Sequence, residues 1–375
     1  MFQAEHEDLR ASLRRFVAER LRPNAAAWED ARHFPDAVFT EMAAHGFLGL
    51  KYPEALGGEG GDHLHDAVLA EELARCGSGG LAAGIGAHVG IATPPIWRFG
   101  TEDQHERFLR PAIAGEQIAA LAITEPDAGS DVAAARTRAE RVDGGWLVDG
   151  AKTYITNGVR ASYYVTAVRT RPEGGHHGLS FLIVPRQDAI TAAPLHKLGW
   201  HASDTAEVAF DGAWVPEENL LGRLHEGFTL VMANFQWERL LMALGAVAAM
   251  QEALERTLAY TKERRAFGRP LTGHQVVRHQ LVDLATRVHT CRCVTYDALA
   301  RFMAGEEPVQ QVTMAKLVTQ RAAFEVIDAC LQLHGGAGYM REYELERMAR
   351  DARLGPIGGG TDEIMREILG KAMGL

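Results

Sequence analysis

The chain has 375 residues, with 39 basic and 49 acidic side chains and a net charge of −10. Apolar residues make up 47% and charged residues 23% of it, which is ordinary for a soluble globular protein. The length allows two or three domains with large cores, and the acidic balance argues against a general nucleic-acid-binding protein.

The four cysteines, Cys76, Cys291, Cys293 and Cys330, fit no disulfide framework. Cys291 and Cys293 lie two residues apart in a helical pattern, so they face different sides and do not form a metal pair. The sequence therefore predicts no structural metal. It predicts a reducing compartment, which is the cytoplasm or, for a processed form, the mitochondrial matrix.

Residues 1–6 run straight into an amphipathic pattern without a basic, apolar leader. Residues 77–97 carry no charge, but six glycines and the pair Pro94-Pro95 interrupt them. We therefore expect buried helix and loop in this stretch, and no membrane span.

Helical patterns dominate the chain up to residue 118. Prolines 23, 35 and 53 mark connections, and so does the glycine-rich run 57–61. This run is a weak phosphate-loop candidate because no strand precedes it, and a surface turn is the simpler interpretation. The predicted helices are 3–21, 35–45, 62–76, 80–91 and 102–112.

Residues 119–225 have a different composition, rich in Val, Thr, Tyr and Ile, with hairpin signals at 143–145 and 172–175. The spacing predicts a small antiparallel sandwich or barrel. The predicted strands are 136–142, 146–149, 163–169, 179–184 and 206–210.

Long helical patterns return from residue 226 to 375, with turns at 305–308 and 335–338. Gly335–Gly338 follows a helix and so lacks the context of a dinucleotide-binding loop. The order of helices, strands and helices predicts an α+β fold with domains at 1–118, 119–225 and 226–375, and disfavours a doubly wound sheet. The predicted helices are 226–264, 274–304, 308–334, 342–352 and 362–372.

Glu238 and Arg239 stand at the start of a long uncharged helical run. On a helix, Glu238 points into an apolar face beside a small residue, and Arg239 lies about 100° further round. Arg239 could thus hold an anion without neutralising Glu238. Alternatively, both are solvated residues at the exposed end of a core helix. The residues sharing the face of Glu238 are Asn234, Phe235, Leu241, Met242 and Gly245.

Two other stretches are dense in hydrogen-bonding groups. Residues 122–131 hold several hydroxyl and carboxyl side chains, with Pro126 and Gly129 shaping a loop. Residues 150–158 add an aromatic face and further donors after a strand. Together they favour a site for a polar, planar ligand.

With these two stretches, the sequence resembles the acyl-CoA dehydrogenase flavoprotein family over nearly its whole length. The resemblance implies a helical domain, an antiparallel β domain and a C-terminal four-helix bundle. It also implies FAD between the latter two domains, and a homotetramer built as a dimer of dimers. The other matching segments are 197–205, 264–271 with Gln275, 332–339 and 350–353.

The resemblance assigns residues to FAD. Thr124, Ser130, Tyr154 and Thr156 would contact the flavin ring or its ribityl chain. The family signature residues that would bind the adenosine and pyrophosphate of a neighbouring subunit's FAD are Arg264, Phe267, Gln275, Gln332 and Gly336. Thr361 and Glu363 occupy further FAD-contact positions, although the family often has Gln at 363.

The catalytic base departs from the commonest family pattern. Many members carry it in a Tyr-Glu-Gly-Thr sequence, whereas this chain has Gly358-Gly359-Gly360-Thr361, with Gly359 at the place of the glutamate. Long-chain and isovaleryl-CoA dehydrogenases place the base on the helix that here contains Glu238. The resemblance therefore implies that Glu238 is the base and that Gly359 leaves space for it.

The implied reaction is α,β-dehydrogenation of an acyl-CoA to the trans-2-enoyl-CoA, with Glu238 removing the Cα proton and a hydride passing to FAD. Apolar surroundings should raise the pKa of Glu238. The N–H of Gly359 would stabilise the thioester oxygen, and Arg239, Ser130 and Phe235 would contact the substrate. Electrons would pass to an electron-transferring flavoprotein. The alternatives are an O₂-using oxidase or monooxygenase on the same fold, and a non-catalytic acyl-CoA-binding relative.

Overall fold

The structure is a computed structural model that describes residues 1–375. Its N-terminal part is helical, as expected, and it also contains a helix at 93–99, within and just beyond the stretch predicted as helix and loop. The two prolines there lie in the first helical turn, where a missing N–H costs nothing. The helices are α1 (Ala4–Phe16), α2 (Ala25–Ala31), α3 (Ala37–Ala44), α4 (His63–Leu73), α5 (Gly79–Ala87), α6 (Thr93–Phe99), α7 (Glu102–Gln104) and α8 (Arg110–Ile113).

The middle part is an eight-stranded sheet in the order β6-β7-β3-β2-β4-β5-β8, with β1 beside β4; a single residue pair, Arg138 with Arg169, joins β2 to β4. Most neighbours are antiparallel, but β1 and β2 each pair with β4 in parallel, so the middle part is not a purely antiparallel domain. The strands are β1 (Ala119–Ala122), β2 (Arg138–Val142), β3 (Gly145–Thr156), β4 (Tyr163–Arg169), β5 (Leu179–Pro185), β6 (Ile190–Pro194), β7 (Thr205–Pro216) and β8 (Leu220–Leu221).

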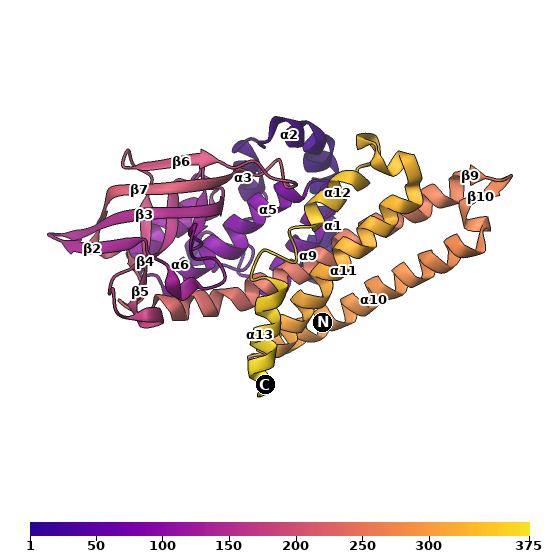
Figure 1. The fold of residues 1–375 in the computed structure, drawn as a ribbon. Helices are drawn as coiled ribbons and strands as arrows, with labels where there is room; N and C mark the ends of the chain where they lie inside the picture. Colours follow the sequence, from indigo (N-terminus) through magenta and orange to yellow (C-terminus); the bar gives the residue numbers. More distant parts are fainter.

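The C-terminal part is a bundle around three long helices (Figure 1). The short β9–β10 hairpin at the far tip of this bundle lies at the opposite end of the molecule from the sheet. The elements are α9 (Gly227–Glu263), β9 (Arg265–Ala266), β10 (Arg269–Pro270), α10 (Gln275–Met303), α11 (Val309–His334), α12 (Leu345–Ala352) and α13 (Asp362–Ala372).

Helix α9 connects the three parts. Its first turns pack through Leu230 and Val231 against β4, β5 and the N-terminal helices. Its middle packs against α4, and its second half forms the bundle core with α10 and α11. A side chain on the middle of α9 can therefore reach the junction of all three parts. None of the helices combines the length and the apolar character that a bilayer-spanning segment needs.

Candidate active site

A cavity of about 1160 Å³ lies at this junction. Its walls come from α4, α5, the loop after β1, the end of β3, α9, and the loop that joins α12 to α13. Nine of the residues assigned from the sequence line it: Thr124, Ser130, Tyr154, Thr156, Phe235, Glu238, Arg239, Gly359 and Thr361. Tertiary folding thus brings together residues that are up to 237 positions apart (361 minus 124).

Glu238 projects into the cavity from the middle of α9. Its Oε2 atom is buried and has no hydrogen-bond partner, which is costly for an ionised carboxylate. Burial raises the pKa of Glu238 to about 7, while the nearby charges of Arg239 and Lys316 act in the opposite direction. The alternative that Glu238 is a solvated surface residue is therefore wrong.

Gly359 faces Glu238 across the cavity. Its φ of 64° lies in the left-handed region, which glycine adopts without strain. A Cβ atom at this position would lie 2.6 Å from Sδ of Met242 and 3.6 Å from Oε1 of Glu238. The space that a side chain at 359 would enter is thus the space beside the carboxyl group of Glu238.

Two buried cations hold the loop at 358–360 by hydrogen bonds to its backbone carbonyls. Nε of Arg239 donates to the carbonyl of Gly359 over 3.2 Å, and Nζ of Lys316 donates to the carbonyl of Gly360 over 2.5 Å. Arg239, expected to contact the substrate, is only 3% exposed and contacts backbone in this structure. Lys316 was not identified from the sequence. The signal for it was a lysine on the buried, apolar face of α11, beside Val312 and Thr319.

A buried ion pair joins the two stretches that would hold the flavin, 122–131 and 150–158. The second stretch was predicted to follow a strand, but strand β3 continues through it as far as Thr156, which still pairs with β7. Nζ of Lys152 donates to Glu125 over 2.7 Å and to the carbonyl of Ile123 over 3.0 Å. The N–H of Thr153 donates to the carbonyl of Thr124 over 2.9 Å. The pair and this backbone hydrogen bond fix the first loop against β3.

The hydroxyl and aromatic groups of these loops suit a flavin. The hydroxyls of Thr124, Ser130 and Thr156 line the cavity and make no hydrogen bond within the chain. Tyr154 lies at an irregularity between β3 and β7, with a φ of 61°, and its ring is 70% exposed. Free donors beside a flat apolar face match the polar edge and the planar ring of an isoalloxazine.

The remaining assigned residues lie elsewhere. Phe267, in the β9–β10 turn, is 95% exposed, and its neighbours stand at the far end of the bundle. The five residues assigned to a neighbouring subunit's FAD do not line the cavity of their own chain. They are Arg264, Phe267, Gln275, Gln332 and Gly336. Glu363 is exposed on the first turn of α13, and the hydroxyl of Thr361 caps that helix by accepting from the N–H of Ile364.

Asp351 is a further residue that the sequence did not single out for a role. Its two carboxylate oxygens accept from the N–H of Trp200 over 2.6 Å and from the N–H of Gly79 over 2.9 Å. Burial raises the pKa of Asp351 to about 6. One side chain of α12 thereby joins the C-terminal part to the sheet region and to α5, at the cavity wall.

Comparisons with known proteins identify the family. The acyl-CoA dehydrogenase N-terminal, middle and C-terminal domains match residues 3–116, 120–213 and 225–374. The mitochondrial long-chain specific acyl-CoA dehydrogenase of Mus musculus is 36% identical over 99% of this chain and 87% of its own length. The mitochondrial isovaleryl-CoA dehydrogenase of Solanum tuberosum is 34% identical over 100% of this chain and 91% of its own.

Solved structures share the whole fold. The crystal structure of a probable acyl CoA dehydrogenase from Mycobacterium abscessus matches with a TM-score of 0.96 and 41% identity, over 99% of each chain. A structure described as the electron transferring flavoprotein of Acidaminococcus fermentans matches with a TM-score of 0.96 and 31% identity, over 100% of this chain and 98% of that one. The chain belongs to the acyl-CoA dehydrogenase family, whose members are FAD-dependent oxidoreductases.

Proposed function

We propose that the protein catalyses the α,β-dehydrogenation of a fatty or branched acyl-CoA, with Glu238 as the base that removes the Cα proton. The observation that carries the proposal is the unpartnered, buried Oε2 of Glu238, which faces the cavity beside Gly359. The carboxylate of an acid whose pKa is near 7 is a stronger base than an ordinary glutamate. It therefore removes a proton from a weakly acidic carbon more readily.

The N–H of Gly359 is a suitable donor for the thioester oxygen. It donates to no acceptor within the chain, whereas the N–H of neighbouring Gly358 is bonded to the carbonyl of Leu354. Arg239 and Lys316 fix the carbonyls of Gly359 and Gly360, which belong to the next two peptide units of the same loop. A preorganised donor of this kind lowers a barrier by roughly 3–4 kcal/mol.

FAD would be held by Thr124, Ser130, Tyr154 and Thr156, and it supplies the acceptor for the hydride that leaves Cβ. In this arrangement the chain itself orients the thioester between Gly359 and Glu238 and receives the proton on the Glu238 carboxylate. Ser130, Phe235 and, through its charge, Arg239 would bound the substrate at the cavity mouth. Thr361 and Glu363 would lie at further FAD contacts.

The assembly is proposed to be a homotetramer, a dimer of dimers. Large apolar side chains are exposed at the tip of the bundle, including Phe267, Val276 and Tyr339, which are 95%, 74% and 76% exposed. Exposed apolar residues gathered in one region are typical of an interaction surface. A neighbouring subunit's FAD would be bound there by Arg264, Phe267, Gln275, Gln332 and Gly336.

Electrons are proposed to pass to an electron-transferring flavoprotein. A chain of the same fold occurs in a structure described as the electron transferring flavoprotein of Acidaminococcus fermentans, and this match supports the proposed partner. The physiological setting that fits this chemistry is fatty-acid or branched-chain acyl-CoA oxidation, in the cytoplasm of a bacterium or in a mitochondrial matrix.

The decisive experiment is anaerobic reduction of the bound flavin by acyl-CoA. Glu238→Gln should bind FAD and acyl-CoA but reduce the flavin about 10²–10⁴-fold more slowly, which is the usual contribution of a positioned base. Glu325→Gln, at an exposed position of α11, is the matched control and should behave as wild type. An unchanged rate in Glu238→Gln would exclude Glu238 as the base. Rapid reoxidation by air with formation of peroxide would identify an oxidase instead.

A further inference from the structure

The cavity continues well beyond Glu238 along one face of α9. The side chains of α9 that line it recur every three or four residues, as one face of a helix requires: Glu238, Met242, Gly245, Ala249, Glu252 and Arg256. The 14 residue-to-residue steps from Glu238 to Glu252 span about 21 Å at the helical rise of about 1.5 Å per residue. This inner segment of the cavity is longer than a short acyl group requires.

Small residues keep the inner segment open. Across from α9, the cavity is lined by Ala70 of α4, by Ala74 directly after that helix, and by Ala82 and Gly86 of α5. A Cβ atom added at Gly86 or at Gly245 would meet nothing within 4 Å, so both glycines border open space. The middle of the segment is therefore wide and apolar.

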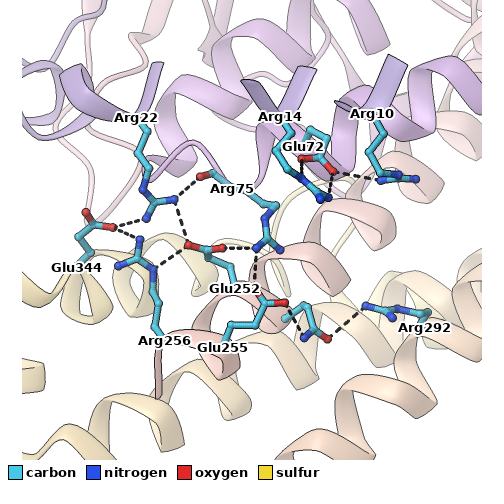
Figure 2. Close-up of polar contacts among 11 residues, drawn as sticks. Arg10, Arg14, Arg22, Glu72, Arg75, Glu252, Glu255, Arg256, Arg292 and Glu344 are labelled. Atoms are coloured by element: carbon cyan, nitrogen blue, oxygen red, sulfur yellow. Dashed lines mark hydrogen bonds and ion pairs between the residues drawn. The ribbon is translucent and has the colours of Figure 1, made fainter. Parts of the chain in front are cut away.

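The inner segment ends at charged side chains, since Arg22, Glu252, Arg256 and Glu344 line the cavity there. Figure 2 shows the ion pairs that these side chains form. We call the group formed by Arg22, Arg75, Glu252, Arg256 and Glu344 the ion-pair cluster. Glu252 lies 3.1 Å from Arg22, 2.9 Å from Arg75 and 2.8 Å from Arg256, and Glu344 lies 3.0 Å from Arg22 and 3.1 Å from Arg256. The cluster ties the segments that follow α1 and α4, through Arg22 and Arg75, to α9 and to the segment before α12.

The ion-pair cluster retains unused hydrogen-bonding capacity. Nη1 of Arg256 and Oε1 of Glu344 have no partner within the chain. The side chains of Arg22, Arg256 and Glu344 are 27%, 28% and 28% exposed, so water reaches this end. A polar group that arrives here from the apolar segment finds both a donor and an acceptor.

We propose that the inner segment binds a long acyl chain of about 16–18 carbons along its whole length, and that its charged end accepts a hydroxyl group on the ω carbon. An extended alkyl chain advances about 1.25 Å per carbon, from a bond of about 1.5 Å and a bond angle near 111°, so about 17 carbons cover the segment. This inference rests on the proposed function, because it assumes that the thioester lies beside Glu238.

An apolar blind end would behave differently. A hydroxyl group buried there without a partner would lose roughly tenfold or more in kcat/KM. At the ion-pair cluster the same hydroxyl group keeps its hydrogen bonds. The comparison of a chain that ends in methyl with one that ends in hydroxyl therefore reports on what the inner end of the cavity contains.

The test measures kcat/KM of the holoenzyme with straight acyl-CoA thioesters of 4, 8, 12, 16 and 20 carbons, and with 16-hydroxyhexadecanoyl-CoA. We expect kcat/KM to be largest at 16 carbons, and the hydroxylated substrate to stay within about threefold of hexadecanoyl-CoA. An optimum at 8 carbons or fewer, or a loss above about tenfold on hydroxylation, would overturn the inference. If no acyl-CoA of any length reduces the flavin, the proposed function itself fails.

Two variants test where the acyl chain of the substrate lies. Gly245→Leu should lower the ratio of kcat/KM for hexadecanoyl-CoA to that for octanoyl-CoA at least about tenfold, because the added side chain fills the space bordering Gly245. Ala259→Leu, on an exposed face of the same helix, is the control and should leave this ratio unchanged. If both variants show the same ratio and contain the same amount of FAD, the acyl chain does not lie beside Gly245.

Arg256→Met tests the charged end. It removes a donor of the ion-pair cluster, so the ratio of kcat/KM for 16-hydroxyhexadecanoyl-CoA to that for hexadecanoyl-CoA should fall about fivefold or more. A general loss of stability would lower both values together and leave the ratio unchanged. An unchanged ratio in a folded, FAD-loaded variant would therefore exclude Arg256 from recognition of the ω end.

Discussion

Arg239 and Lys316, from two different helices, donate to the carbonyls of two successive glycines, 359 and 360. Both cations are buried, and burial lowers the pKa of Lys316 to about 8. A buried lysine whose hydrogen-bond acceptor is a carbonyl, with no carboxylate within ion-pair distance, is unusual and commonly marks a functional site. Here the two cations fix the loop that carries the proposed oxyanion donor, and both favour the ionised form of Glu238.

Lys316→Met should slow flavin reduction about tenfold or more, because the loop loses one of its two anchors. It should also raise the pKa of Glu238, since the positive charge that favours the carboxylate is gone. The rate of flavin reduction should then rise with pH around a midpoint above that of wild type. Lys262→Met, at an exposed position of α9, is the control. A lower rate with an unmoved midpoint would indicate that Lys316 acts on the loop alone.

The pKa of Glu238 also links stability to pH. Its folded value of about 7 lies above the usual value of about 4.5, so the fold favours the protonated form. The stabilisation is present at low pH and is lost as pH rises through 4.5 to 7. Glu238→Gln, which stays neutral, should therefore melt at a higher temperature than wild type at pH 8 and at a similar temperature at pH 5. Melting curves of FAD-loaded proteins at both pH values check this, and a constant difference would contradict it.

Moving the proposed catalytic base from position 238 to position 359 requires a third substitution. Glu238→Gly combined with Gly359→Glu should remain nearly inactive, because the new Cβ would lie 2.6 Å from Sδ of Met242 and the backbone at 359 has a positive φ. Adding Met242→Ala should recover about tenfold in flavin reduction by making room for the glutamate side chain. The control is Met242→Ala alone. If the triple variant binds FAD and substrate but gains nothing, the two positions are not interchangeable.

The buried pair Lys152–Glu125 should matter for both stability and cofactor binding. Lys152→Met leaves the Glu125 carboxylate buried without its cation, which costs roughly 3–5 kcal/mol of unfolding free energy. The double variant Lys152→Met with Glu125→Gln should recover part of this loss. Denaturant unfolding measures the free energies, and the flavin absorbance of the purified variants measures FAD content. A loss as large in the double variant as in the single one would refute the ion-pair explanation.

Local patterns in the sequence were sufficient to predict part of the fold and part of the candidate site. The order of helices, strands and helices follows from residue periodicity, and so does the apolar face that surrounds Glu238, because both depend on neighbours within a few residues. The loops at 122–131 and 150–158 were identified by their composition. The space left at Gly359 was implied by the resemblance to the family, and the structure places Glu238 beside it.

Long-range contacts decided the rest. Strand β1 has the sequence Ala-Ala-Leu-Ala, which has little strand preference of its own, and it forms because it pairs with β4 more than 40 residues later. Lys316 and Asp351 acquire their roles from backbone groups of distant segments, which no local pattern reveals. The depth of the cavity likewise depends on how α4, α5 and α9 pack, because open space beside a glycine exists only once its neighbours are placed.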